Sequence, residues 1–440
     1  GWRGAAPPPY DLVLMGISHA DERAYLANVW KTYAFAFLMN FQFWHSIWVL
    51  YLRDYRGFSL TQITLLDVPF WLLVVLLEVP SGAFADRFGR RTSLVLSSGF
   101  FSVAILIFGL TGNYLVILFS YSLWAISLTF MSGADSAILF DSLKMVGREE
   151  EFAKVSGRVW AVMAAGALGG TIVGGPMAEA TNLAFPVAVS SVVAALAMVM
   201  ALMMREPPLH AGETVRYVDL FRDARDIVWQ RPAVRSFMGV ATVIGVASFA
   251  PAVFFQQPFL DRHGVAVRNF GFVQAPNLLA GVATALVAYR LVRIAGRRGV
   301  YFWMAGALVA MYALLGTADT VWAFAAFPAV VGVRNLLQPL AGDYLNQRVP
   351  SSHRATVLSV RSLLFSLAIA PAEPLLGLVA DHVSLLAVFR VSALALAVVA
   401  PLVLVWWLRA DAREPLPSES AQEPPSDVTL AGEAAPSSGA

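Results

Sequence analysis

The amino-acid sequence predicts an all-α membrane protein with twelve transmembrane helices in two repeated six-helix bundles. The prediction rests on its composition, on regularly recurring apolar runs and on an internal repeat. Of its 440 residues, 58% are hydrophobic and 14% are charged, and the mean hydropathy is +0.66. Soluble domains typically carry about 25% charged residues. A chain this apolar belongs in a lipid bilayer.

The apolar runs are long enough to cross the hydrocarbon core, which takes about 20 residues. Because that core offers no water to the backbone, a spanning run must satisfy its own hydrogen bonds as a helix. We expect spans at residues 31–53, 60–85, 92–111, 114–143, 155–179, 182–204, 233–260, 268–292, 299–318, 320–346, 354–381 and 384–408.

Lysine and arginine are distributed unevenly over the predicted loops. One side carries only Arg53, Arg56, Arg262 and Arg268, whereas most of the 31 basic residues lie on the other. Loops rich in these residues stay in the cytoplasm. The pattern predicts an even number of spans, both termini in the cytoplasm and a multi-pass protein of the plasma (inner) membrane.

The long polar segment after Met204 divides the chain six spans plus six. We expect an N-terminal cytoplasmic segment at 1–30, a six-helix bundle at 31–204, a cytoplasmic linker at 205–232, a second bundle at 233–408 and a disordered cytoplasmic tail at 409–440, whose Pro, Ser and Glu content cannot bury a core. Within the linker, an apolar stripe favours an amphipathic helix on the membrane surface, although a solvated linker helix fits as well. The stripe consists of Val215, Val218, Phe221, Ile227 and Val228.

The two halves share landmarks in register. Gly89-Arg90-Arg91 matches Gly296-Arg297-Arg298, Asp141 matches Asp343, Arg158 matches Arg361, and residues 178–183 match 380–385. A parallel repeat of six-helix halves is typical of one large transporter architecture, in which the substrate site lies between the halves near the midplane.

Several function classes are excluded by what the sequence lacks. The formal net charge of +2 does not indicate a nucleic-acid-binding surface. There is no cysteine, which excludes a disulfide, a thiolate metal site and a cysteine nucleophile. The H-E-x-x-H and G-x-S-x-G motifs are also missing. We expect neither an enzyme nor a cofactor or metal.

The segment SGAFADRFGRR, residues 81–91, resembles the G-x-x-x-D-R-x-G-R-R loop signature of the major facilitator superfamily. The matching residues are Gly82, Asp86, Arg87, Gly89, Arg90 and Arg91, between the second and third spans. The resemblance implies the major facilitator fold, secondary transport by alternating access and, as is usual in the family, a functional monomer.

The resemblance also assigns roles to this loop. It implies that Asp86 faces the start of the eleventh helix, near Arg354, and that Arg90 pairs with Asp141 at the end of the fourth. A carboxylate at a helix N-terminus is stabilised by about 0.3 to 1 kcal/mol. These residues would form a conformational latch on the inner side, and the alternative is that they anchor the helices at the headgroups.

A glycine-rich stretch in the fifth span, residues 165–180, partly resembles the Gly-Pro motif of proton-coupled antiporters. Gly174, Gly175 and Pro176 fit that motif, but Thr171 stands in place of a glycine and Glu179-Ala180 replaces a closing glycine pair. Close helix packing explains the glycines equally well.

Acidic residues inside the spans are candidates for proton coupling, because charging them in hydrocarbon costs several kcal/mol. Asp67 and Glu78 share a helix face with Trp71, and Asp67 is the first choice. Glu78 precedes Pro80 and has a structural alternative. Asp135 points either into the cavity or into a network with Arg158.

The remaining polar groups in the spans are candidates for the substrate cavity. Arg334 and Glu373 form the obvious charge pair, and an unpaired Arg334 would bind an anion. His45 is more often a satisfied polar residue than a proton carrier. The full set of cavity candidates is Asn40, His45, Trp71, Gln256, Gln274, Asn277, Arg334, Gln338 and Glu373. Mixed aromatic and amide groups suit an amphipathic organic molecule.

These observations predict a secondary active transporter of a small organic molecule, proton-coupled, with export of an amphipathic compound by antiport favoured. Its partners would be the substrate, protons and the lipid bilayer. The alternatives are proton-coupled uptake of a nutrient or organic anion, and a non-transporting membrane receptor or scaffold.

Overall fold

The computed structural model describes residues 18–208, 228–349 and 353–414, and its regular elements there are all helical. The N-terminal half comprises α1 (His19–Asn40), α2 (Trp48–Leu50), η1 (Tyr51–Tyr55), α3 (Leu60–Leu65), α4 (Asp67–Phe88), α5 (Arg90–Leu110), α6 (Tyr114–Met131), α7 (Ala134–Lys144), η2 (Glu149–Glu151), α8 (Phe152–Ala180) and α9 (Ala184–Leu202). The C-terminal half comprises α11 (Pro232–Arg262), η3 (Val267–Asn269), α12 (Phe270–Thr317), η4 (Val321–Ala325), α13 (Ala326–Asn346), α14 (Arg354–His382) and α15 (Leu385–Arg413).

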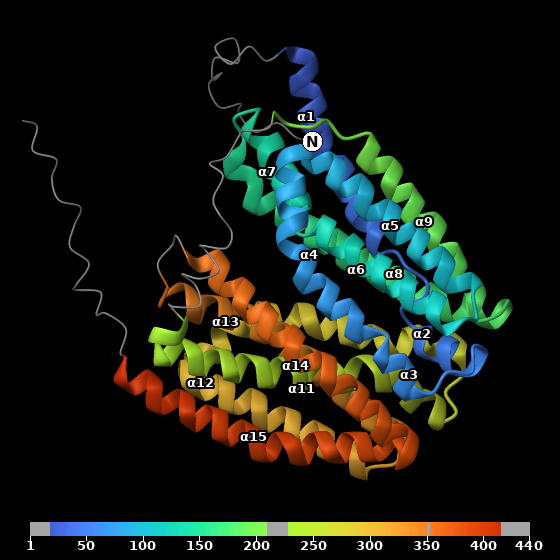
Figure 1. Ribbon diagram of the computed structural model, residues 1–440, viewed down its shortest axis with the longest axis vertical. Coiled ribbons are helices and arrows are strands. Elements are labelled where there is room, and N and C mark those ends of the chain that lie inside the picture. The colour runs from blue at the N-terminus through green and yellow to red at the C-terminus, as the bar shows by residue number, and fades with distance from the viewer. Residues whose placement is uncertain (1–17, 209–227, 350–352, 415–440) are drawn as a thin grey trace, which may run out of the picture.

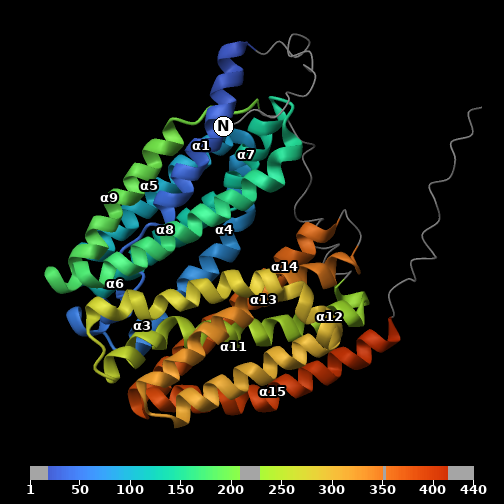
Figure 2. The ribbon, with the colours of Figure 1, turned by 180° about the vertical axis from the view of Figure 1, so that it is seen from behind.

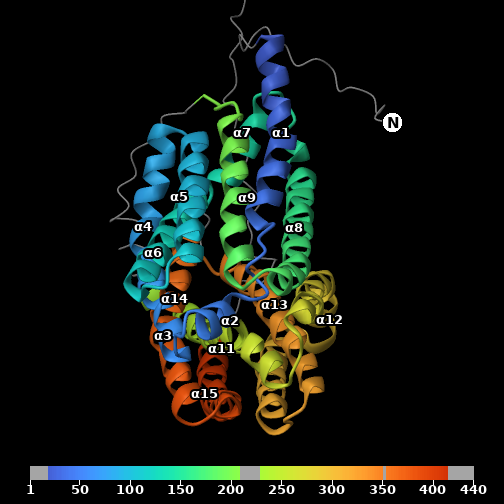
Figure 3. The same cartoon turned by 90° about the vertical axis from the view of Figure 1, so that its right-hand side faces the viewer.

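The two halves form separate bundles that meet at one end (Figures 1 and 2). Figure 3 shows one bundle stacked on the other, with α2 and α3 at their junction. We call the side that carries the Gly89–Arg91 and Gly296–Arg298 turns the basic face, and the side with α2, α3 and η3 the opposite face. In Figure 1 the bundles diverge toward the basic face, at the ends of α7 and α13.

The helices present apolar side chains outward, as a bilayer requires. Leu110, Leu286, Trp303 and Leu394 are each at least two-thirds exposed. Among the described residues, ten helices are long and apolar enough to cross a membrane. The all-α membrane fold predicted from the sequence is confirmed.

The count of twelve spans stays a prediction that depends on how two segments are counted. Gly296 has a φ of 69° inside α12, so that helix consists of two straight parts joined by a kink. At the start of the chain, α1 continues through a break into α2 and η1. Twelve spans result if α12 counts as two and the segment from α1 to η1 counts as one.

Two helices extend beyond the spans predicted for them. The first helix begins at His19, not near residue 31, because Ser18 caps it by accepting the Asp21 N–H and the helix extends beyond the apolar run. The last helix ends at Arg413, not at 408, because the buried Asp411 holds its final turn. The predicted amphipathic stripe at 215–228 falls almost entirely outside the described residues.

The first predicted span, 31–53, is interrupted between Phe41 and Ile47. Side chains of the other half satisfy the backbone that this break releases. Gln257 of α11 accepts the Val49 N–H at 2.9 Å and donates to the His45 carbonyl at 2.9 Å. Gln274 of α12 donates to the Ser46 carbonyl at 3.0 Å. The break therefore serves as a connection between the halves.

The halves also join at other points of the opposite face. Asp381 of α14 accepts the N–H groups of Leu60 and Thr61 at the start of α3. Arg268 of η3 binds Glu179 at the end of α8 at 3.0 Å. The helix pairs that join the halves are α14 with α3 and α4, α11 with α2, and α8 with α12 and η3. The opposite face is closed in this conformation.

The closure predicts that Gln257→Leu shifts the carrier toward a state in which the opposite face opens and the basic face closes. The substitution removes two hydrogen bonds between the halves, each contributing about 1 kcal/mol, so the ratio of the two states should shift by about thirtyfold. Because the chain has no cysteine, spin labels at Lys144→Cys and Asn346→Cys report the distance between α7 and α13 directly. We expect a larger fraction of short distances.

The matched control is Tyr312→Phe, which removes a buried hydrogen bond to the Ala247 carbonyl within one half. It should leave the distance distribution unchanged. An equal response of both variants, or none from Gln257→Leu, contradicts a role for Gln257 in holding the opposite face closed.

Candidate functional site

A cavity of about 710 Å³ lies between the two halves. The N-terminal half contributes α4, α6, α7 and α8, and the C-terminal half contributes α11, α13 and α14. Among the predicted residues, its lining includes Trp71, Glu78, Asp135, Arg334 and Gln338. Its size and its mixture of apolar walls with a few polar groups are typical of a small-molecule site.

Three aromatic rings from both halves meet in the wall of this cavity. Trp71 of α4 contacts Phe249 of α11 and Phe365 of α14 with ring centroids 5.6 and 5.5 Å apart, and Phe249 and Phe365 are 5.9 Å apart. All three pairs have edge-to-face geometry, which stabilises aromatic pairs. We call these residues the aromatic cluster. Through this cluster, α4 of the N-terminal half contacts α11 and α14 of the C-terminal half.

Beside the aromatic cluster, two carboxylates from opposite halves are buried together. Asp67 at the start of α4 is 9% exposed and Glu373 of α14 is fully buried. Their charges are close enough to interact, and the Trp71 indole lies beside both. Glu373 has no hydrogen-bond partner for either carboxylate oxygen within the described part of the chain. Tyr121 of α6 also lies near the pair.

No arginine or lysine forms an ion pair with Asp67 or Glu373 among residues 18–208, 228–349 and 353–414. Two carboxylates in one apolar site cannot both keep a charge, because they repel each other and neither is solvated. The geometry can therefore hold a proton at the contact between the halves, with Trp71 separating it from the cavity.

The predicted ion pair between Arg334 and Glu373 is wrong. Glu373 faces Asp67 on α4, whereas Arg334 lies on α13 with its guanidinium 5.4 Å from the Phe249 ring centroid. Sequence spacing gave both residues similar depths, but it cannot tell which neighbour each helix face meets. Arg334 is left without a carboxylate partner in the described chain and lines the cavity.

A smaller cavity of about 200 Å³ gathers other predicted residues beside the break in the first span. It is lined by His45, Gln256, Gln274, Asn277 and Arg334, among others. Arg334 thus contributes to both cavities. The candidate Asn40 lies in neither, because its side chain donates to the Ala36 carbonyl of its own helix.

The predicted latch is partly assembled. Arg90 forms an ion pair with Asp141 of α7, as the resemblance implied. Asp86 and Arg87 are exposed, and within the described residues Asp86 forms no ion pair at the start of α14. The space beside Gly82 is also empty. The contact of Asp86 with α14 stays a prediction for a conformation whose basic face is closed.

Sequence analysis missed an acid at the basic face of each half. Glu206 follows α9 and accepts the Arg90 and Arg91 N–H groups at 2.8 and 2.7 Å, which caps α5. A side chain on Gly89, which has a φ of 100°, would collide with the Glu206 carboxylate.

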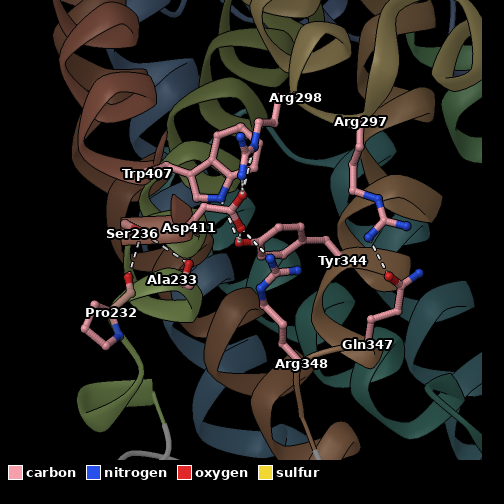
Figure 4. A network of polar contacts seen from close by, with 10 residues as sticks. All are labelled: Pro232, Ala233, Ser236, Arg297, Arg298, Tyr344, Gln347, Arg348, Trp407 and Asp411. Carbon is pink, nitrogen blue, oxygen red and sulfur yellow. Dashed lines mark hydrogen bonds and ion pairs between the residues drawn. The ribbon is translucent and has the colours of Figure 1, made fainter. Parts of the chain in front are cut away.

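Asp411 of α15 takes the corresponding place in the second half (Figure 4). Its carboxylate accepts Arg298 at 2.7 Å and the Tyr344 hydroxyl at 2.8 Å, and it also binds Arg348. Trp407 donates to the same hydroxyl at 2.8 Å. An acid just after the sixth span of each half was visible in the repeat, but Glu206 was assigned to the linker and Asp411 to the tail.

The glycines of α8 pack closely against neighbouring segments. Added β-carbons on Gly166 and Gly170 would lie 2.7 Å from the Phe37 carbonyl oxygen and 2.6 Å from the Gln42 backbone nitrogen. An added β-carbon on Gly175 would lie 2.5 Å from the Val267 carbonyl oxygen of η3. Packing therefore accounts for these glycines.

Comparison with known proteins agrees with this architecture. The sequence model described as Major Facilitator Superfamily matches residues 30–293 and again 236–437. The uncharacterized MFS-type transporter YxaM of Bacillus subtilis (strain 168) is 23% identical over 372 residues, covering 81% of this chain and 90% of that protein.

Among solved structures, the nucleoside transporter NupG has a TM-score of 0.71 at 11% identity, covering 87% of this chain and 99% of that one. A bacterial homolog of the human lysosomal transporter Spinster, inward-facing and unoccupied, has a TM-score of 0.66 at 18% identity, covering 90% and 98%. A POT family transporter in complex with 5-aminolevulinic acid has a TM-score of 0.65 at 14% identity, covering 88% and 96%. At these identities the likeness concerns the fold.

The twofold match of the family model, together with the loop signature at Gly82–Arg91, establishes that this chain belongs to the major facilitator superfamily and is a membrane transporter, not an enzyme.

Proposed function

We propose that this transporter moves a small amphipathic organic molecule across the plasma (inner) membrane by alternating access, coupled to protons. The observation that carries the coupling is the buried pair of Asp67 and Glu373 at the contact between the halves. The Lys and Arg bias supports a cytoplasmic basic face, on which both termini would lie. The working unit we propose is the monomer.

The position of the carboxylate pair supports a simple coupling cycle. While the opposite face is closed, α4 and α14 hold the two carboxylates together without a cation, so the pair retains a proton. Opening that face separates the helices and admits water, so the pair exchanges its proton with that side, and closure requires a bound proton. With that face closed, movement of Trp71 out of the cavity wall lets the pair release the proton toward the basic face, so that each cycle carries it across the membrane.

Export by proton antiport is the direction we propose first, since part of the Gly-Pro pattern is present in α8. Packing of its glycines explains that pattern without a direction. Proton-coupled uptake of a nutrient or organic anion is the second candidate, and the unpaired Arg334 in the cavity favours it.

The proposal predicts the behaviour of Asp67→Asn and Glu373→Gln in reconstituted vesicles. Wild-type protein is first screened with an imposed pH gradient over dyes, sugars, amino acids and organic anions. Each neutral variant mimics a permanently protonated group, so it should lose gradient-driven accumulation by about tenfold or more while retaining substrate exchange without a gradient. Accumulation is measured with a radiolabelled substrate, and proton movement with a pH dye inside the vesicles.

Asp319→Asn is the control, because Asp319 is an exposed acid that pairs with Arg262 between α12 and η4. It should transport as the wild type does. Unchanged pH dependence in both membrane variants would sink the proposed role of the carboxylate pair.

The latch assigned to Asp86 makes a separate prediction. If Asp86 docks on the N-terminus of α14 when the basic face closes, Asp86→Asn destabilises the closed state by up to about 1 kcal/mol. Spin labels at Lys144→Cys and Asn346→Cys should then show a larger fraction of long distances between α7 and α13. This change is opposite to the one expected for Gln257→Leu.

Glu149→Gln, an exposed acid in η2 on the basic face, is the control for this change in charge. It should have no effect. If Asp86→Asn leaves the distances unchanged, Asp86 is only an anchoring charge.

A further inference from the structure

The wall of the central cavity that belongs to the N-terminal half carries two carboxylates. Glu78 of α4 and Asp135 of α7 are both half-buried and line the cavity. Asp135 accepts the N–H of its neighbour Ser136 at 2.6 Å. Neither acid forms an ion pair within the part of the chain that the structure describes. This wall presents two carboxyl groups to the cavity.

The wall that belongs to the C-terminal half carries two guanidinium groups. Arg361 of α14 donates to the Gln338 side chain at 2.7 Å, while its Nε is buried without a partner. Arg334 lies over the Phe249 ring. Neither arginine forms an ion pair with an acid of the described chain, so this wall presents positive charge to the same cavity.

Between the charged walls lies the aromatic cluster of Trp71, Phe249 and Phe365. It offers an apolar surface in the cavity wall. A cluster of His, Cys, Asp or Glu able to hold a metal ion does not occur among the described residues, so the two acids do not form a cation-binding cage with other ligands.

We propose, on the basis of the transport function proposed above, that the cavity binds a zwitterionic amphipathic solute. Its anionic group binds Arg334 and Arg361, its cationic group binds Glu78 and Asp135, and its apolar body packs on the aromatic cluster. Arginine suits carboxylate and phosphate groups because its planar guanidinium can donate two parallel hydrogen bonds.

Closure of the basic face explains why both charges are required. In the open state, the four side chains line a cavity that can hold water. When the halves approach and expel water, an uncompensated charge becomes costly. The empty carrier can close because the acidic side chains of one wall and the arginines of the other attract each other. A carrier loaded with a zwitterion can also close, because each charge of the solute compensates the wall of opposite charge. A solute with one charge leaves a wall uncompensated and resists closure.

The test measures binding of two matched quartets to the purified full-length protein. Tryptophan and phenylalanyl-phenylalanine are each used as the free zwitterion, the N-acetylated anion, the C-amidated cation and the doubly blocked neutral compound. Binding is measured from the concentration dependence of the thermal shift. For a scaffold that binds, the zwitterion should bind at least about tenfold more tightly than either singly charged form, which corresponds to about 1.4 kcal/mol.

Variants assign each end of the solute to a wall. Arg334→Gln and Arg361→Gln should abolish the preference for the zwitterion over the C-amidated cation, while Arg334→Lys should retain part of it. Glu78→Gln and Asp135→Asn should abolish the preference for the zwitterion over the N-acetylated anion. Arg262→Gln, at the opposite face, should change neither. The thermal midpoint without ligand identifies variants that do not fold.

Tighter binding of a singly charged or neutral form than of the zwitterion overturns the proposal. An equal loss of binding affinity for all four forms in the variants also overturns it. Binding of no member of either quartet also overturns it, even if the vesicle assay shows proton-coupled transport of another solute. Conversely, a zwitterion preference without any flux in vesicles leaves the site standing and refutes the transport cycle proposed above.

Discussion

The structure is governed by one constraint: inside a bilayer, a polar group must find its partner within the protein or face a water-filled space. The break in the first span illustrates it. The backbone released between Phe41 and Ile47 binds Gln257 and Gln274, which belong to the other half. What would be a defect in a single helix therefore becomes a connection that exists only while the opposite face is closed.

The same constraint sorts the charged side chains of the spans into two groups. Asp67 and Glu373 are excluded from water at the contact between the halves, where only a proton can neutralise them. Glu78, Asp135, Arg334 and Arg361 face the cavity, where water or a solute can do so. Trp71 stands between the two groups, with its ring in the cavity wall and its indole beside the carboxylates. It is the side chain through which occupancy of the cavity can reach the proton site.

The sequence predicted the helical fold and the two halves, because apolar run length, charge asymmetry and the repeated loop are local signals. The Arg90–Asp141 pair was implied by the resemblance to the major facilitator superfamily. The sequence did not reveal that Asp67 faces Glu373 or that Arg334 is unpaired. Those facts depend on which helix faces meet across the two halves, and residues more than 300 positions apart in the chain carry no local mark of their contact. Glu206 and Asp411 are intermediate between the features that the sequence predicted and those that it did not reveal. The repeat places an acid after the sixth span of each half, but composition alone assigned both to polar segments.

The two halves have the same architecture, yet their cavity walls carry opposite charge, and this asymmetry has a mechanical consequence. If both walls carried charge of one sign, closure of the empty carrier would be opposed by repulsion in a medium that screens poorly. With acids on one side and arginines on the other, closure is favoured by attraction and opposed by the loss of solvation, so the two terms nearly cancel. A near balance is what alternating access requires, since neither end state can be much more stable than the other if the carrier is to turn over. In the cycle proposed above, the proton on Asp67 and Glu373 decides the balance at the opposite face, and the solute decides it at the basic face.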